Sequence, residues 1–140
     1  MAKGLTITKG VSPAMQWFKY RQNNSGGVFT YPAAMVFVQA TSAVKADRLA
    51  KRAVGIYFDG VESGVDCDCC GDRWNCAYVG DGQDAPTFHG HGIADSDGNF
   101  CPTVASDLFA MAAEDGVPDI ALVFADGHVT YRDRKKDVPR

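Results

Sequence analysis

The sequence predicts a single α+β domain, in which an antiparallel sheet of about five strands packs with two helices and carries an irregular Cys/Gly-rich insertion. Three observations predict this class. Short apolar and aromatic runs alternate with turn residues, two stretches show helical periodicity with matching end signals, and residues 60–102 show little periodicity of either kind. A chain of 140 residues is long enough to bury one core.

The domain is expected to span residues 15–131, between an extended arm at 1–14 and a polar tail at 132–140. Glycine and proline interrupt the arm, and charged residues dominate the tail, so neither has the pattern of a packed element. No apolar run approaches the roughly 18–20 residues of a membrane-spanning helix. The N-terminus also lacks the apolar segment of a secretory signal. An intracellular location is therefore expected.

The first elements are expected to be strands. Residues 15–21 are rich in aromatic side chains and suit a strand, and the asparagine and glycine residues at 23–27 then favour a turn. Residues 28–31 can pair back after this turn. Pro32 interrupts that run, and a strand resumes over 34–39.

A helix is expected over residues 43–53. Thr41 and Ser42 are candidate N-caps, and Gly55 lies where a left-handed residue commonly ends a helix. The apolar positions recur at i, i+3, i+4 and i+7, which predicts one buried stripe. These positions are Ala46, Leu49, Ala50 and Ala53. A short strand at 56–58 and a turn at 59–60 are expected to follow.

The last part of the domain again shows regular patterns. A second helix is expected over 103–115, followed by a strand over 119–125. Asp126-Gly127 is a strong signal for a two-residue hairpin, and the chain is expected to return through 128–131.

Charge is distributed unevenly along the chain. Residues 1–58 carry eight Lys and Arg against one acid, residues 59–119 carry thirteen acids against one base, and residues 120–140 carry five bases against three acids. Asymmetry of this kind bears on partners and assembly more than on fold. The basic and acidic regions are expected to lie near each other, within the fold or across a subunit contact. Nucleic-acid binding is not favoured, because apolar residues separate the N-terminal bases.

The most distinctive stretch is Asp66-Cys67-Asp68-Cys69-Cys70-Gly71-Asp72-Arg73-Trp74. Cys67 and Cys70 form a CxxC pair, the spacing at which one tight turn directs two thiolates at a tetrahedral ion. A structural zinc is therefore predicted, with Cys69 and Cys76 as the further ligands. Reduced unliganded thiols, or redox and disulfide chemistry, are the alternatives. Other candidate donors are Cys101, His89 and His91.

The same stretch suggests a ligand-binding surface. Arg73 and Trp74 place a guanidinium beside an aromatic face, a combination that can bind a phosphate or a nucleobase. The favoured alternative is that Trp74 packs into the core and Arg73 pairs with a neighbouring aspartate. The loop residues Asn24, Ser25 and Gly26 can bind an anion through their amides, but a plain turn is the favoured interpretation.

Two further motif comparisons are incomplete. A zinc deaminase needs His-x-Glu and Pro-Cys-x-x-Cys, and neither is present. Residues 95–99 begin like a calcium loop but lack its later glycine and glutamate, so a solvated turn is the better interpretation. No spacing favours a cysteine nucleophile with a histidine base. The chain is therefore expected to act without catalysis, and no catalytic residue is predicted.

With these motifs in view, the chain resembles a family of small, largely uncharacterised proteins of tailed bacteriophages. The resemblance rests on Asn-Asn-Ser-Gly-Gly at 23–27, on Tyr-Phe-Asp-Gly at 57–60, and on the cysteine motif at 66–74. It implies a phage origin, with the host cytoplasm as the site of action or the virion as an alternative. It brings no established activity.

The leading functional prediction is a phage accessory protein that binds a host protein or a small nucleotide-type ligand. In this prediction, the cysteine cluster with its zinc shapes the binding surface. A virion structural component, such as a decoration or neck protein, is the alternative, and the uneven charge suits a homo-oligomer or another assembly. A metal-dependent enzyme ranks third.

Overall fold

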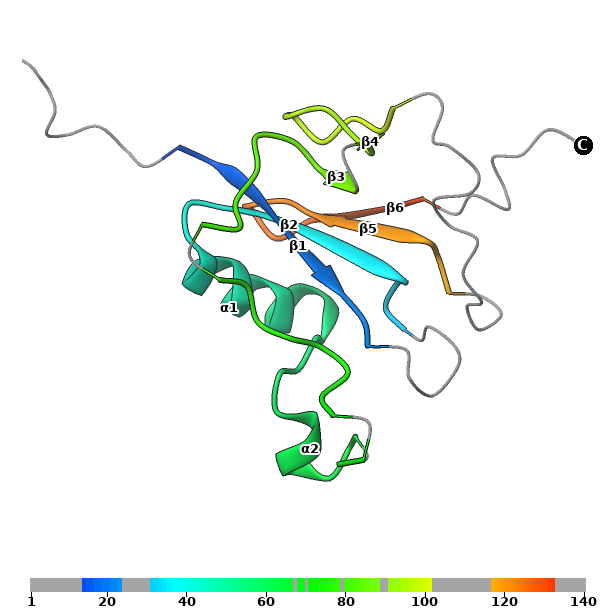
Figure 1. The fold of residues 1–140 in the computed structure, drawn as a ribbon. Helices are drawn as coiled ribbons and strands as arrows, with labels where there is room; N and C mark the ends of the chain where they lie inside the picture. The colour runs from blue at the N-terminus through cyan, green and yellow to red at the C-terminus, as the bar shows by residue number, and fades with distance from the viewer. Residues whose placement is uncertain are drawn as a thin grey trace, which may run out of the picture.

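The computed structural model describes residues 14–23, 31–66, 68–69, 71–78, 80–88, 91–101 and 117–132. Within these residues the α+β class is confirmed, with a four-stranded sheet, a separate two-stranded sheet and two helices (Figure 1). The elements in chain order are β1 (Gln16–Arg21), β2 (Met35–Ala40), α1 (Ala43–Val54), α2 (Gly60–Ser63), β3 (Thr87–Phe88), β4 (His91–Gly92), β5 (Ile120–Val123) and β6 (Val129–Arg132).

The four-stranded sheet has the order β1-β2-β5-β6 and is mixed. β1 pairs with β2 and β5 pairs with β6 in antiparallel fashion, but β2 and β5 run parallel, with Met35 opposite Ile120. The prediction of a wholly antiparallel sheet is therefore wrong. A parallel pair needs a long crossover connection, and the chain between β2 and β5 provides it. Both central strands are apolar and almost entirely buried, as strands covered on both faces must be.

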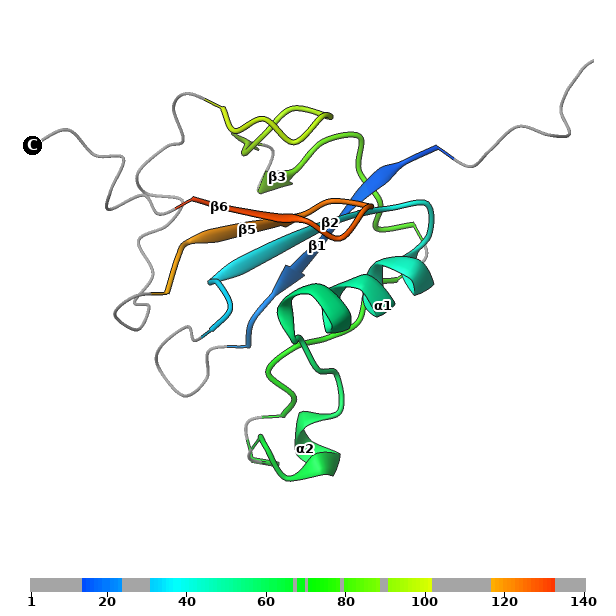
Figure 2. The ribbon, with the colours of Figure 1, turned by 180° about the vertical axis from the view of Figure 1, so that it is seen from behind.

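The helix α1 covers one face of this sheet (Figure 2). It begins where predicted, because the Ser42 side chain accepts a hydrogen bond from the Lys45 N–H at 3.2 Å. It ends at Gly55, whose left-handed backbone (φ 74°) lets its N–H bond back to the Lys51 carbonyl. The predicted stripe of α1 packs against Val36 and Val38 of β2.

Residues 86–88 and 91–101 cover the opposite face of the sheet, and β3 and β4 pair in antiparallel fashion within them (Figure 1). Their core residues are Phe88, Ile93 and Ala94, packed with Trp17, Met35, Phe37, Ile120 and Leu122 of the sheet. Cations from both edge strands add to this contact. Arg21 of β1 lies over the Phe88 ring at 5.1 Å, and Arg132 of β6 lies over the Phe100 ring at 5.7 Å.

The strand expected at 56–58 is wrong. The Ile56 N–H bonds to the Ala50 carbonyl as part of the C-terminal cap of α1, so this donor is not available to a sheet. Where a turn was expected at 59–60, the chain begins the short helix α2. The Asp72 carboxylate accepts a hydrogen bond from the Val61 N–H at 2.8 Å and so satisfies a free donor of that helix.

The turn predicted at Asp126-Gly127 does join two antiparallel strands, with Gly127 at φ 97° between β5 and β6. Its loop has three residues instead of the predicted two, because the Phe124 N–H bonds to the His128 carbonyl. None of the helices in the described part of the chain has the length and hydropathy to cross a membrane. Several predictions lie outside the described residues: the strand at 28–30, the helix at 103–115, almost all of the arm at 1–14, and the tail at 133–140.

Candidate functional site

Trp74 of the cysteine motif is a core residue. Its side chain is 1% exposed and belongs to the cluster beneath α1, so the indole offers no open face to a ligand. The backbone of Trp74 forms a β-bridge with Gln22, directly after β1. The interpretation of Trp74 as a packing residue therefore agrees with the structure, and the motif ends by joining the edge of the sheet.

The acidic residues of the motif hold its turn in place. Asp66 accepts hydrogen bonds from the Arg73 N–H at 2.8 Å and from the Tyr57 hydroxyl at 3.3 Å. Asp72 caps α2 through Val61, as described above. Burial, followed by the Asp66 charge, raises the pKa of Tyr57, so its hydroxyl stays a proton donor. These carboxylates satisfy backbone and side-chain donors within the protein, which is a structural role.

The Arg73 guanidinium faces the sheet. Its Nη1 donates to Gln22 Oε1 at 3.0 Å, and the buried Gln22 amide donates in turn to the Ala33 carbonyl at 2.7 Å. Arg73 is partly exposed, and it is already engaged by this chain of hydrogen bonds. The loop residues predicted to bind an anion beside it, Asn24, Ser25 and Gly26, lie outside the described residues.

The predicted zinc ligands are not all within the described residues. Cys67 and Cys70 lie outside them, and Cys69 is exposed and disulfide-bonded. Cys76 and Cys101 have free thiols. Across the part of the chain that the structure describes, no three His, Cys, Asp or Glu side chains are grouped to hold a metal. Zinc binding by Cys69 would need its reduced form, because a zinc ligand must be a thiolate. Structural zinc remains a prediction.

A second region, which the sequence motifs did not indicate, has the geometry of a binding site. An open pocket of about 320 Å³ lies where β2 and β5 end. Because these two strands are parallel, their carboxyl ends meet at one edge of the sheet, the usual place for a ligand in sheets of this kind. The lining residues are Met15, Gln39, Ala40, Thr41, Lys45, Arg48, Leu49, Arg52 and Ala125.

One wall of this pocket is strongly basic. Lys45, Arg48 and Arg52 follow each other at i, i+3 and i+7 along α1, so they share one face of the helix. All three are exposed, and none forms an ion pair with another described residue. The one acid of α1, Asp47, is turned away and accepts hydrogen bonds from the Tyr20 hydroxyl and the Ala77 N–H. The basic wall therefore has no internal counter-charge from its own helix.

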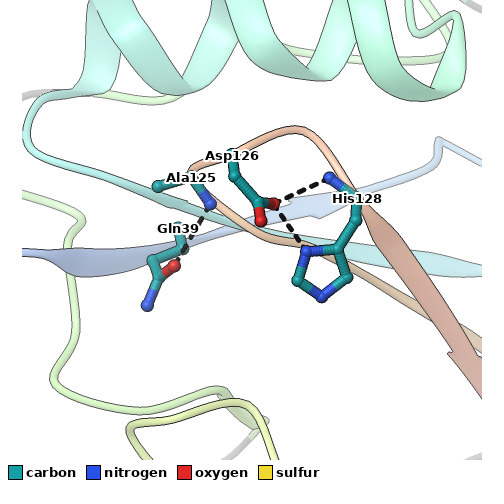
Figure 3. Close-up of polar contacts among 4 residues, drawn as sticks. All are labelled: Gln39, Ala125, Asp126 and His128. Carbon is teal, nitrogen blue, oxygen red and sulfur yellow. Dashed lines mark hydrogen bonds and ion pairs between the residues drawn. The ribbon is translucent and has the colours of Figure 1, made fainter.

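The hairpin after β5 contributes Ala125 to the pocket lining, and Figure 3 shows the polar contacts of this hairpin. The Ala125 N–H donates to Gln39 Oε1 at 3.1 Å, which joins the two strand ends. Asp126 accepts a hydrogen bond from the His128 N–H, and its Oδ1 lies 2.5 Å from His128 Nδ1. The His128 contacts hold the pKa of Asp126 below its usual range. The His128 ring stacks on Phe124 with 4.1 Å between centroids.

Comparison with known protein families assigns the chain to one of them. A family model described as Domain of unknown function (DUF7296) matches residues 15–138. The chain belongs to this family. No curated protein matches the chain, and no solved structure matches it either.

The DUF7296 match covers every described helix and strand, from β1 to β6. It also covers every residue that lines the basic pocket, from Met15 to Ala125. The pocket is therefore part of the DUF7296 domain itself. The uneven charge of residues 1–58 was the sequence signal for it, since three of their eight bases line the pocket.

Proposed function

We propose that this DUF7296 domain acts by binding a small phosphate-bearing ligand in the basic pocket. The observation that supports this proposal is the row of three exposed cations on α1, placed where the carboxyl ends of two parallel strands meet. Like charges on one helix face repel each other, and an anion bound between them would turn this repulsion into attraction.

The chemistry of the three side chains suits phosphate. An arginine guanidinium presents a planar set of donors that matches phosphate oxygens, and a lysine ammonium adds a compact charge. The pocket also lies beside the first turn of α1, whose dipole is positive at that end. Thr41 brings a hydroxyl that can donate to the same oxygens.

The biological setting is part of the same proposal. The resemblance to small tailed-phage proteins supports a phage origin, and a nucleotide-type ligand in the host cytoplasm would meet the chemistry of the pocket. Compared with Arg73 and Trp74, the pocket is the better candidate for this role. Trp74 is buried and Arg73 is bonded to Gln22, whereas the pocket cations are exposed.

Isothermal titration calorimetry at low ionic strength tests the proposal, with orthophosphate, pyrophosphate and adenine nucleotides as probes. Arg48→Glu should weaken binding at least about tenfold, because a hydrogen bond to a charged group contributes about 1.5–3 kcal/mol and about 1.4 kcal/mol corresponds to tenfold. Lys51→Glu is the matched control. It makes the same charge change on the same helix, but Lys51 lies over the Phe58 ring and does not line the pocket.

Two results would contradict the proposal. One is that none of the probes binds the wild-type protein. The other is that Lys51→Glu weakens binding as much as Arg48→Glu, which would mean that general charge, and not the pocket, attracts the ligand.

A further inference from the structure

We infer that the ligand is a nucleoside di- or triphosphate whose phosphate chain lies along α1 and whose nucleoside rests on the apolar wall of the same pocket. This inference depends on the proposed function and makes it more specific. It starts from the spacing of the three cations and from the division of the pocket into a basic wall and an apolar wall.

The basic wall is longer than one phosphate group. With a rise of about 1.5 Å per residue, the step from Lys45 to Arg48 is about 4.5 Å along the helix axis, and the step from Arg48 to Arg52 is about 6 Å. A single phosphate can be met by two of these side chains and leaves the third without an anion. Two or three linked phosphates carry charged oxygens along a longer chain, and these oxygens can contact all three cationic side chains in turn.

The order of the three cations along α1 also indicates how the phosphate chain is oriented in the pocket. Side chains on a helix lean toward its N-terminus, so Arg48 and Arg52 extend back toward the Thr41 end of the pocket. Lys45 and the positive end of the helix dipole lie at that end, whereas Arg52 belongs to the last turn of α1. The terminal, most highly charged phosphate is therefore best stabilised beside Lys45, and the rest of the phosphate chain extends toward Arg48 and Arg52.

The apolar wall selects against inorganic polyphosphate. Met15, Leu49 and Ala125 come from three separate parts of the chain and meet in this pocket. Met15 lines the pocket and keeps 51% of its surface exposed, so its side chain is available to a ligand. Its flexible thioether is well suited to rest on an aromatic base. An amphipathic ligand would cover this surface, whereas a wholly charged one would leave it in water.

The size of the pocket sets an upper limit. Its volume of about 320 Å³ lies near the lower end of the range for ligand sites, which is about 300–1,000 Å³. One nucleoside with its phosphates fits this class better than a dinucleotide cofactor does. A nucleic-acid strand is also disfavoured, because apolar residues separate the other Lys and Arg residues of positions 1–58 along the sequence.

Calorimetry with AMP, ADP, ATP, pyrophosphate and inorganic triphosphate tests this inference on the full chain. ADP or ATP should bind at least tenfold more tightly than AMP, since AMP cannot reach the whole row of cations. ADP should also bind more tightly than pyrophosphate. Arg52→Gln should weaken ADP binding severalfold and leave AMP nearly unchanged, while Met15→Ala should weaken ADP binding and leave pyrophosphate unchanged.

The outcomes separate this inference from the proposed function. If AMP and ADP bind equally, or if pyrophosphate binds as tightly as ADP, the polyphosphate or the nucleoside part is wrong, although the pocket still binds phosphate. If a short oligonucleotide competes better than ADP, the ligand is a nucleic acid and the inference fails. If no probe binds at all, both statements fail together.

Discussion

Replacing Gly98 with alanine tests how residues 91–101 are held against the sheet. Gly98 has a left-handed backbone with φ 84°, and a Cβ at this position would lie 2.3 Å from Phe124 Cε2 and 3.3 Å from Trp17 Cη2. Neither ring can move easily, because Phe124 packs edge-on against Trp17 with 5.5 Å between centroids. The Trp17 indole N–H is also bonded to the Ser96 carbonyl at 3.0 Å.

The expected loss of stability has two parts. A left-handed backbone costs a non-glycine residue about 1–2 kcal/mol, and forcing an extra carbon into packed rings costs about 1–3 kcal/mol. Gly98→Ala should therefore lower the free energy of unfolding by about 2–5 kcal/mol. This is a large fraction of the roughly 5–15 kcal/mol that stabilises a typical domain.

Gly64→Ala is the matched control. Gly64 has the same φ of 84°, but nothing lies within 4 Å of the position that its Cβ would take. Urea denaturation followed by tryptophan fluorescence should give a loss of about 1–2 kcal/mol for this variant. The double variant Gly98→Ala with Phe124→Leu should recover part of the packing cost. If Gly98→Ala costs no more than Gly64→Ala, residues 91–101 are not packed against the sheet as described.

Four further predictions concern the polar contacts and the cysteines. Asp47→Ala should cost about 2–4 kcal/mol in urea denaturation, because it leaves the Tyr20 hydroxyl and the Ala77 N–H without an acceptor; Tyr20→Phe should cost less. Tyr20 and Asp95 affect the stability of the protein at opposite ends of the pH range. Burial, then Asp47, raises the pKa of Tyr20, so its contribution is present below about pH 10 and is lost at higher pH, and Tyr20→Phe should flatten the alkaline limb of the stability curve. Backbone hydrogen bonds lower the pKa of Asp95, so its contribution is present above about pH 3.9 and is lost as pH falls, and Asp95→Asn should flatten the acid limb. Native mass spectrometry of the protein with reduced thiols should find bound zinc, and Cys69→Ser should lower the zinc content. Absence of zinc from the protein with reduced thiols would contradict the structural-zinc prediction.

The sequence predicted those elements whose stabilising contacts are local. The ends of α1 depend on Ser42 and Gly55, which bond to backbone groups only three to five residues away. The hairpin depends on Asp126 and Gly127 and on their neighbours. Residues 95–99 form the expected turn because Asp95 accepts bonds from the backbone N–H groups of Asp97 and Asn99. Contacts at this range can be read from residue types and spacing alone.

Contacts between distant segments were harder to predict. The destination of Trp74 depends on its bridge to Gln22, and the position of Arg73 depends on the side chain of the same residue. Neither pairing leaves a periodic pattern in the sequence. The strand expected at 56–58 is absent for a related reason, because the Ile56 N–H bonds to the C-terminal cap of α1 and not to a neighbouring strand. A run of three apolar residues does not indicate which of these two partners the N–H takes.

The missed parallel pairing and the missed pocket have one cause. Residues 35–38 of β2 and all of β5 are continuous apolar runs that are fully buried, whereas β1 mixes buried and exposed positions and β6 has only half-buried and exposed ones. Continuous runs are typical of central strands covered on both faces, and such strands are commonly parallel. Two parallel strands place their carboxyl ends together, and the helix that follows the first of them supplies side chains to that edge. The cations of α1 then line a pocket because of the topology, although their spacing alone predicts only a solvated helix face.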